Sequence, residues 1–233
     1  MKEPITRQTF LEKNSMSADL AEYIKQQILD GQLNPGDRIV ETKVAKELGI
    51  SQTPVREAIR QLSGEGIITI VPNKGPMVRQ FDMKDVFEVY SLRSMLEGLA
   101  IRLAVQQASD EEISKLSAFF EDMKRKLVDD TVDSLLEESV HIHQSIVRLA
   151  NHSRLAASYD SITFSISLAG RILGKVSTKQ KEVDQHAELI EALVRRDPDH
   201  AEKVMRQHIL RSFNEFRELP EAKGWNYDDI IWL

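Results

Sequence analysis

Apolar side chains recur every three or four residues along most of the chain, which is the spacing of amphipathic helices. The first such stretch is expected to begin at Ser17, which can cap the first amides, and to end at Gly31. Gly49 separates the next two short stretches, and the second of these opens with Pro54. Proline is tolerated there because the first amides of a helix have no helical partner. The pattern predicts a helix, a tight turn and a second helix.

The helix that begins near Pro54 has two chemically different sides, and Gly64 and Gly66 end it. The apolar side contains Val55, Ala58, Ile59 and Leu62. The polar side contains Gln52, Thr53, Arg56, Glu57 and Arg60. One side is therefore expected to face a core, and the other is expected to remain in water.

A hairpin is predicted directly after this helix. Residues 67–71 form a β-branched run, residues 73–75 have the composition of a turn, and a return strand starts at Val78. Residues 39–40 are expected to pair with the hairpin as a short strand. A helix pair with an arginine-bearing outer face, followed by a basic hairpin, is typical of a winged helix-turn-helix that reads the major groove. The alternative is an ordinary helical corner with a hairpin and no nucleic acid.

From about residue 82 onward the pattern is almost entirely helical. Ser109 and Glu112 have the spacing of a capping box, and Asp197 followed by Pro198 marks another helix start. The predicted helices cover 83–107, 109–128, 132–151, 154–175, 177–196 and 198–219. Residues 1–16 are expected to be a loosely ordered lead-in, and the pattern assigns no structure to 220–233.

Charge is distributed unevenly between the two halves. The whole chain has a net charge of −6, which by itself argues against a nucleic-acid binder. Residues 1–80 contain 11 basic and 10 acidic side chains, whereas residues 81–233 contain 20 and 27. Residues 38–80 contain 7 basic and 4 acidic side chains, so the positive charge coincides with the predicted helix pair. We therefore expect two domains, 1–81 and 82–233.

Composition also excludes several classes of protein. The chain contains no cysteine, which excludes disulfides and thiolate metal sites. No apolar run reaches the roughly 18 residues that a membrane span requires. No basic segment followed by an apolar segment resembles a leader. We expect a cytoplasmic protein with no membrane partner.

The first domain carries the residues of a known family. The matching stretches are 28–36, 48–59, Leu62, Glu65-Gly66 and 73–75. They closely resemble the GntR family of bacterial transcription regulators over about residues 17–80. The resemblance implies a DNA-binding winged helix-turn-helix, and most relatives are repressors that an effector releases, although activation stays open.

A set of polar side chains is expected to contact double-stranded DNA. These are Thr42, Ser51, Gln52, Thr53, Arg56, Arg60 and Lys74. The family often has arginine where this chain has Gln52, and because glutamine pairs with adenine whereas arginine favours guanine, a different operator preference is expected. One recognition helix reads too few bases to be specific, so we expect a homodimer on an inverted repeat.

The second domain carries a further resemblance. The matching residues are Leu92-Arg93, Leu96-Glu97, 141–151, 184–186, Ile190, Leu193, 196–198, Ala201, Met205 and Gln207-His208. They resemble the C-terminal effector domain of the FadR-type branch of the GntR family, the FCD domain. The resemblance implies an antiparallel all-helical bundle of six or seven helices around a closed cavity, with small organic or sugar acids as effectors. The fold class is therefore mainly α: a winged helix-turn-helix followed by a helical bundle.

Three of the six histidines lie on apolar helix faces. His143, His186 and His208 point the way of the apolar stripe, whereas His141 lies on a solvent face. A single inward histidine is usually a hydrogen-bonded core residue. Three imidazoles that converge in one bundle are a common way to hold a divalent metal.

The FCD resemblance implies a metal held by these three histidines and an aspartate one turn before the first. Here that position is Ser139, which is a poor ligand for a dication. The outcomes left open are a three-histidine site completed by water and effector, a weaker site, or no metal. Zinc is expected first, with nickel or manganese as alternatives.

Arg93 is the predicted effector-binding residue. It lies on an inward face, where it either pairs with Glu97 at i+4 or holds an effector carboxylate. We predict a ligand-responsive regulator that is not an enzyme. An acid that enters the bundle is expected to repack helix 83–107. Two alternatives remain: a metal-free regulator that responds to acyl chains, and a three-histidine metal-dependent hydrolase.

Overall fold

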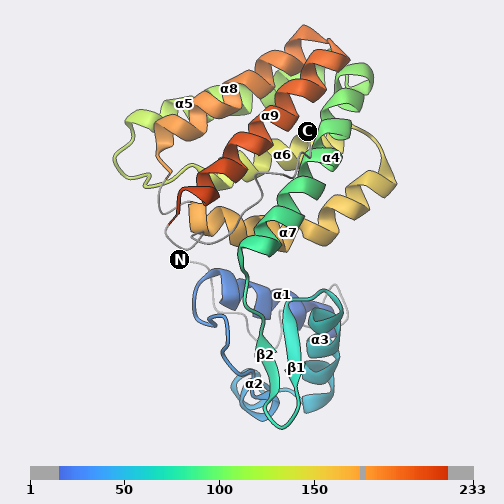
Figure 1. The fold of residues 1–233 in the computed structure, drawn as a ribbon, viewed down its shortest axis with the longest axis vertical. Coiled ribbons are helices and arrows are strands. Elements are labelled where there is room, and N and C mark those ends of the chain that lie inside the picture. The colour runs from blue at the N-terminus through green and yellow to red at the C-terminus, as the bar shows by residue number, and fades with distance from the viewer. Residues whose placement is uncertain (1–15, 174–176, 220–233) are drawn as a thin grey trace. The chain divides into compact units, whose positions relative to one another are not determined.

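A computed structural model describes residues 16–173 and 177–219 of the chain (Figure 1). These residues form two compact units that divide between Phe81 and Asp82, and each unit is described by itself. Most of the predicted lead-in and the segment 220–233 lie outside the described residues.

The first unit contains three helices and a two-stranded sheet. The elements are α1 (Met16–Leu29), α2 (Glu41–Leu48), α3 (Gln52–Gly64), β1 (Ile68–Val71) and β2 (Gly75–Val78). Helices α1 and α2 both pack against α3. The apolar side of α3 is buried as predicted: Val55, Ala58, Ile59 and Leu62 are each at most 3% exposed. Burial of this side fixes the polar side of α3 toward solvent.

Two residues with positive φ make the turns of this unit possible. Gly49 has φ of 64° and its N–H contacts the carbonyl oxygens of Ala45 and Lys46, which ends α2. This left-handed conformation strongly favours glycine. Asn73, at φ of 63°, shapes the hairpin turn between β1 and β2.

The hairpin is antiparallel, with Ile68 opposite Val78. The expected third strand lies slightly earlier than predicted. The bridge to the hairpin joins Arg38 to Met77, and the Ile39 amide donates to the Pro76 carbonyl at 2.9 Å. The pairing does not continue beyond Ile39, because α2 begins at Glu41.

The second unit is all-helical within the described residues. Its elements are α4 (Met83–Gln107), α5 (Asp110–Arg125), the 3-10 helix η2 (Lys126–Val128), α6 (Leu136–Leu149), α7 (Ser153–Leu173), α8 (Lys179–Arg195) and α9 (Pro198–Arg217). Helix α4 packs side by side with α9 and also contacts α6 and α7 (Figure 1). Helix α8 contacts α4, α6 and α9. The three helices that bear the predicted histidines, α6, α8 and α9, therefore all pack around α4.

Capping chemistry sets several helix starts. The predicted capping box is confirmed: Ser109 accepts from the Glu112 amide, and Glu112 accepts from the Ser109 amide. Asp197 caps α9 by accepting from the His200 amide at 3.1 Å, with Pro198 as the first helical residue. These side chains satisfy amides that have no partner inside the helix.

One predicted helix start is wrong. Helix α6 begins at Leu136 and not near residue 132, because Asp129 accepts from both the amide and the hydroxyl of Thr131. This local side-chain turn competes with helix formation.

Candidate functional site

Three histidine side chains from three helices meet inside the second unit. His143 on α6, His186 on α8 and His208 on α9 are each at most 3% exposed. The Nε2 atom of His143 lies 3.2 Å from Nε2 of His186 and 3.1 Å from Nε2 of His208. His141, on the opposite side of α6, is exposed and stacks on Phe119. The structure thus brings together the three inward histidines that the sequence singled out.

Neighbouring acceptors determine where two of these rings carry their protons. Nδ1 of His143 contacts Oε2 of Glu97, and Nδ1 of His186 lies 2.6 Å from the backbone carbonyl oxygen of Glu182. Carboxylate and carbonyl oxygens only accept hydrogen bonds, so both Nδ1 atoms are protonated and donate. In a neutral ring the Nε2 atom then carries a lone pair.

All three rings are held neutral by burial. Burial lowers the pKa of His186 to about 3, with the nearby His143 as a second cause. Burial likewise lowers the pKa of His208 well below its usual value, and lowers that of His143 against the opposing effect of Glu97. The lone pairs of His143 and His186 therefore face each other across 3.2 Å. A cation among the three nitrogens would convert this repulsion into attraction.

The residues present fit a divalent transition metal. Zinc–nitrogen bonds of 2.0–2.1 Å at tetrahedral angles place two nitrogens about 3.3 Å apart, close to the spacings here. Metal-bound histidines commonly donate their other N–H to a carboxylate or a backbone carbonyl, and His143 and His186 each do so. Nδ1 of His208 has no hydrogen-bond partner within the described part of the chain.

Glu97 connects this cluster to α4. Its Oε1 atom accepts from Nε of Arg93 at 2.5 Å, while its Oε2 atom accepts from His143. Burial is the largest single influence and would raise the pKa of Glu97, but the contacts with Arg93 and His143 together outweigh it and hold the pKa at about 2. The Arg93 guanidinium also lies over the ring of Tyr90, 5.4 Å from its centroid. Arg93 is therefore both paired with Glu97 and next to the histidines.

A second carboxyl group lies at the site and was missed by sequence reasoning. Oγ of Ser139, at the position where an aspartate was expected, lies 2.7 Å from Oε2 of Glu182 on α8. Glu182 is buried, and its Oε1 atom accepts from Ser177. A signal was available: Glu182 precedes His186 by four residues, which is the spacing between Ser139 and His143.

A cavity of about 60 Å³ adjoins the histidines. Its walls include Arg93, Ser139, Glu182, His143, His186 and His208. The volume is well below the roughly 300 Å³ at which drug-sized ligand pockets begin. A bound acid of more than a few atoms therefore requires the walls to move.

The polar side chains expected to contact DNA are all at the surface of the first unit. Thr42, Ser51, Gln52, Thr53, Arg56, Arg60 and Lys74 are each exposed. Nε of Arg56 donates to Oε2 of Glu41 at 2.7 Å, and Nη2 donates to Gln52 at 3.1 Å. The Arg56 side chain remains 58% exposed, so these contacts position it without removing it from solvent.

One further basic side chain lies beside the hairpin turn. Arg38 is exposed, and its guanidinium lies so close to Gly75 that a Cβ there would be 3.7 Å away. Arg38 was not among the predicted DNA contacts because only its pairing with the hairpin brings it near Lys74. It adds positive charge beside the hairpin turn.

Comparisons with known proteins agree with this arrangement. Residues 16–78 match the model of the bacterial regulatory proteins of the gntR family, and residues 88–211 match the FCD domain. The Nta operon transcriptional regulator of Aminobacter aminovorans is 31% identical over 187 residues, covering 79% of this chain and 87% of that protein. The chain belongs to the GntR family and carries an FCD domain. It is a DNA-binding transcriptional regulator.

Other GntR proteins extend the comparison. A probable D-xylose utilization operon transcriptional repressor of Paenarthrobacter nicotinovorans is 28% identical, covering 85% of this chain and 88% of that protein. The solved structure of E. coli McbR/YncC aligns with a TM-score of 0.69 at 20% identity, covering 88% of this chain and 100% of that chain. A GntR regulator from Rhodococcus sp. RHA1 aligns with a TM-score of 0.70 at 18% identity, covering 91% and 100%. These structures support the winged helix-turn-helix and helical-domain fold.

No helix in the described part of the chain combines the length and the apolar character that a membrane span needs.

Proposed function

We propose that this GntR regulator is a repressor that a small organic or sugar acid releases from its operator, and that the acid binds beside a divalent metal in the FCD domain. The observation that carries the proposal is the convergence of the imidazole nitrogens of His143, His186 and His208 in a buried site. Neutral imidazoles with inward lone pairs are suited to a metal and unsuited to one another.

Zinc is the expected metal, with nickel or manganese as alternatives. Protein purified without chelator should carry near-stoichiometric transition metal by elemental mass spectrometry, and His208→Ala should remove it. His141→Ala is the matched control, because His141 is exposed and lies outside the cluster. Wild-type protein that neither carries metal nor takes it up on titration would refute the metal site.

Arg93 is proposed to hold the carboxylate of the effector. The guanidinium has five N–H donors, and its contact with Glu97 uses the Nε donor. Two relatives, the gluconate operon repressors of Bacillus licheniformis and Bacillus subtilis, are 26% and 24% identical, which supports a sugar acid as the class to test first. A small acid also suits the small cavity better than an acyl chain does.

The effector is best found by a thermal-shift screen of organic and sugar acids, with and without added metal. A ligand that binds only the folded state raises the melting temperature. An acid that passes this screen should then weaken DNA binding in a mobility-shift assay. Arg93→Lys, which retains the positive charge beside Glu97, should keep DNA binding and lose the response to the acid. An unchanged response would contradict the role of Arg93.

The regulator is proposed to bind an inverted repeat as a homodimer. Leu92, Met95 and Leu99 follow one another at helical spacing on α4, and all three are exposed. Beside them Arg206 of α9 crosses α4 at Gly98, where a Cβ would be 3.0 Å from Nε of Arg206. An apolar strip of this kind is suited to cover the same strip of a second copy.

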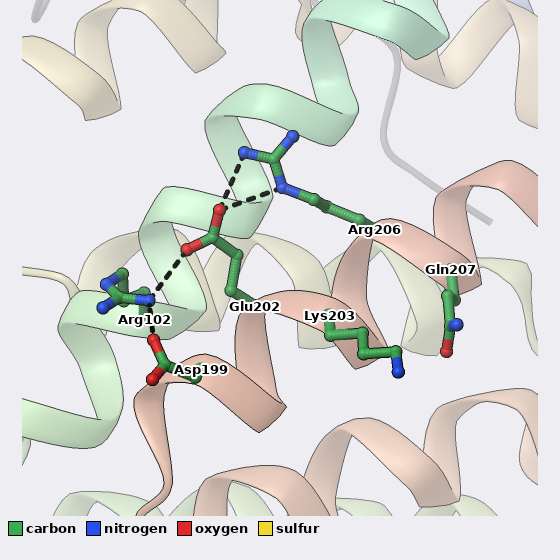
Figure 2. A pocket seen from close by; sticks show the side chains of 6 residues that line it. All are labelled: Arg102, Asp199, Glu202, Lys203, Arg206 and Gln207. Atoms are coloured by element: carbon green, nitrogen blue, oxygen red, sulfur yellow. Dashed lines mark hydrogen bonds and ion pairs between the residues drawn. The ribbon is translucent and has the colours of Figure 1, made fainter. Parts of the chain in front are cut away.

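The rim of this strip is charged with both signs. Figure 2 shows Glu202 between Arg206 and Arg102, with Asp199 on the other side of Arg102. The same residues, with Lys203 and Gln207, line a surface hollow of about 450 Å³. A surface that carries both signs of charge can be complementary to a second copy of itself across a two-fold axis.

Dimerisation through this surface can be tested by light scattering. Met95→Glu should convert a dimer into a monomer and weaken binding to an inverted repeat. Val194→Glu is the control, because Val194 is an exposed apolar residue on α8. A monomeric wild type, or a dimeric Met95→Glu variant, would contradict this interface.

We also propose that the protein acts in the cytoplasm and is not an enzyme. A three-histidine hydrolase must admit and release a substrate at every turnover. Here the histidines are at most 3% exposed beside a cavity of about 60 Å³. Glu97, the carboxylate that contacts His143, has a pKa of about 2 and is a weak base. Turnover of ester or amide substrates by the metal-loaded protein would favour the enzyme instead.

A further inference from the structure

Glu182 is a buried carboxyl group without a cationic partner among the described residues. Within the described part of the chain its carboxylate contacts two serine hydroxyls, Ser139 at Oε2 and Ser177 at Oε1. Ser139 has a single hydroxyl hydrogen and also lies 3.0 Å from the Leu135 carbonyl oxygen, so Glu182 shares that donor. Buried carboxylates are normally paired with a cation or coordinate a metal. Neutral hydroxyls alone compensate this group poorly.

The position of Glu182 relates it to the three histidines. Glu182 lies one turn before His186 on α8, as Ser139 lies one turn before His143 on α6. Residues four apart on a helix share a face, and the side chains of both pairs line the same cavity. A carboxyl group is therefore present at the site although position 139 has none.

The balance of charge at the site also favours a carboxylate next to a bound dication. Arg93 and Glu97 neutralise each other, and the three imidazoles are neutral. A dication added to this set would bring two uncompensated positive charges into a buried cluster. One carboxylate from Glu182 would leave a single positive charge, which one carboxylate of an acid effector would neutralise.

We propose that Glu182 is the carboxylate ligand of the metal held by His143, His186 and His208, so that α8 supplies what the serine at position 139 does not. The carboxylate turns from the Ser139 hydroxyl to the metal when the metal binds. This inference rests on the proposed metal site, and it predicts a site with three nitrogen ligands and one oxygen ligand.

The test is a metal titration of chelator-treated protein in competition with a chromophoric chelator, using zinc for affinity and cobalt for its absorption spectrum. Glu182→Gln preserves shape and should weaken zinc at least about tenfold, since even loss of groups behind the ligands costs 10–100-fold. The cobalt spectrum of this variant should also change, because one oxygen ligand is lost. In the Glu182→Gln background, Ser139→Asp should restore most of the affinity.

Glu215→Gln is the matched control. Glu215 lines the same cavity, but it pairs with Lys181 at 2.9 Å and accepts from Gln185. Its loss removes the same charge without removing a ligand, so affinity should be kept. Wild-type affinity and spectrum in Glu182→Gln would overturn the inference, as would equal weakening in Glu215→Gln or failure of Ser139→Asp to rescue. A wild type that binds no metal would instead overturn the proposed metal site itself.

Discussion

Glu97→Gln should destabilise the FCD domain strongly while changing almost none of its shape. In the wild type, two separate carboxylate oxygens accept from two donors, Nε of Arg93 and Nδ1 of His143. Glutamine has only one acceptor oxygen. Either Arg93 loses its partner, or the amide group faces Nδ1 of His143 and forces that atom to accept.

The magnitude follows from burial of the pair. Glu97 is fully buried and Arg93 is 6% exposed, so Glu97→Gln leaves a guanidinium charge inside the domain without an anion. Breaking a buried ion pair on one side costs about 3–5 kcal/mol. In a domain of this size each kcal/mol lowers the melting temperature by roughly 2–4 °C, so a decrease of roughly 6–20 °C is expected.

Scanning calorimetry of chelator-treated protein would measure this decrease. The matched control is Glu88→Gln, because Glu88 pairs with Lys84 on the same helix but both side chains are exposed. An exposed pair contributes at most about 1 kcal/mol. If Glu97→Gln melted within the range of Glu88→Gln, the pair would not carry the charge balance of the core, and the reasoning about an effector that competes for Arg93 would fail.

Two further predictions concern the DNA-binding domain. Arg56→Ala should weaken binding to DNA selected from a random library by about 1–3 kcal/mol, measured by mobility shift, whereas substitution of the exposed Lys115 of α5 by alanine should not. A decrease in the salt dependence of binding would assign Arg56 to phosphate, and an unchanged dependence to a base. Gly49→Ala should destabilise by about 1–2 kcal/mol in thermal unfolding, because φ is 64° there. Gly64→Ala should have a small stabilising effect, because it lies in helix α3 with open space around a Cβ. Equal effects at the two glycines would refute the argument from φ.

The sequence was sufficient for elements that are specified locally. Helix α4 runs over the predicted range 83–107, where an apolar stripe coincides with a cap at Asp82. The start of α6 was predicted too early because residues 129–135 offer the backbone local side-chain partners as well as a helical pattern. Periodicity reports which face is apolar, but it does not report which of two hydrogen-bonding options the backbone takes.

In the candidate site, too, features set within one helix were predicted, whereas features that depend on packing between helices were not. The inward direction of His143, His186 and His208 follows from their spacing within single helices, and it was predicted. The contact between Ser139 and Glu182 joins residues 43 positions apart, so it depends on how α6 packs against α8. No spacing in the sequence specifies that packing. The missing aspartate was therefore visible in the sequence, whereas the contact between position 139 and the carboxyl group of Glu182 was not.

The Arg93–Glu97–His143 chain would give the FCD domain a physical means of responding to the proposed acid effector. A ligand shifts a conformational equilibrium only if it interacts differently with the two states. Arg93 holds Glu97 in the structure described here, and an effector carboxylate that competes for the same guanidinium would weaken that contact. Glu97 would then keep its hydrogen bond from His143, and the charge of the metal held by that histidine would balance the carboxylate. Arg93 and Glu97 both lie on α4, the helix that follows the hairpin in the chain, so the helix would change its packing at the point where the acid binds. On this argument the ligand signal begins as an exchange of carboxylates at one arginine.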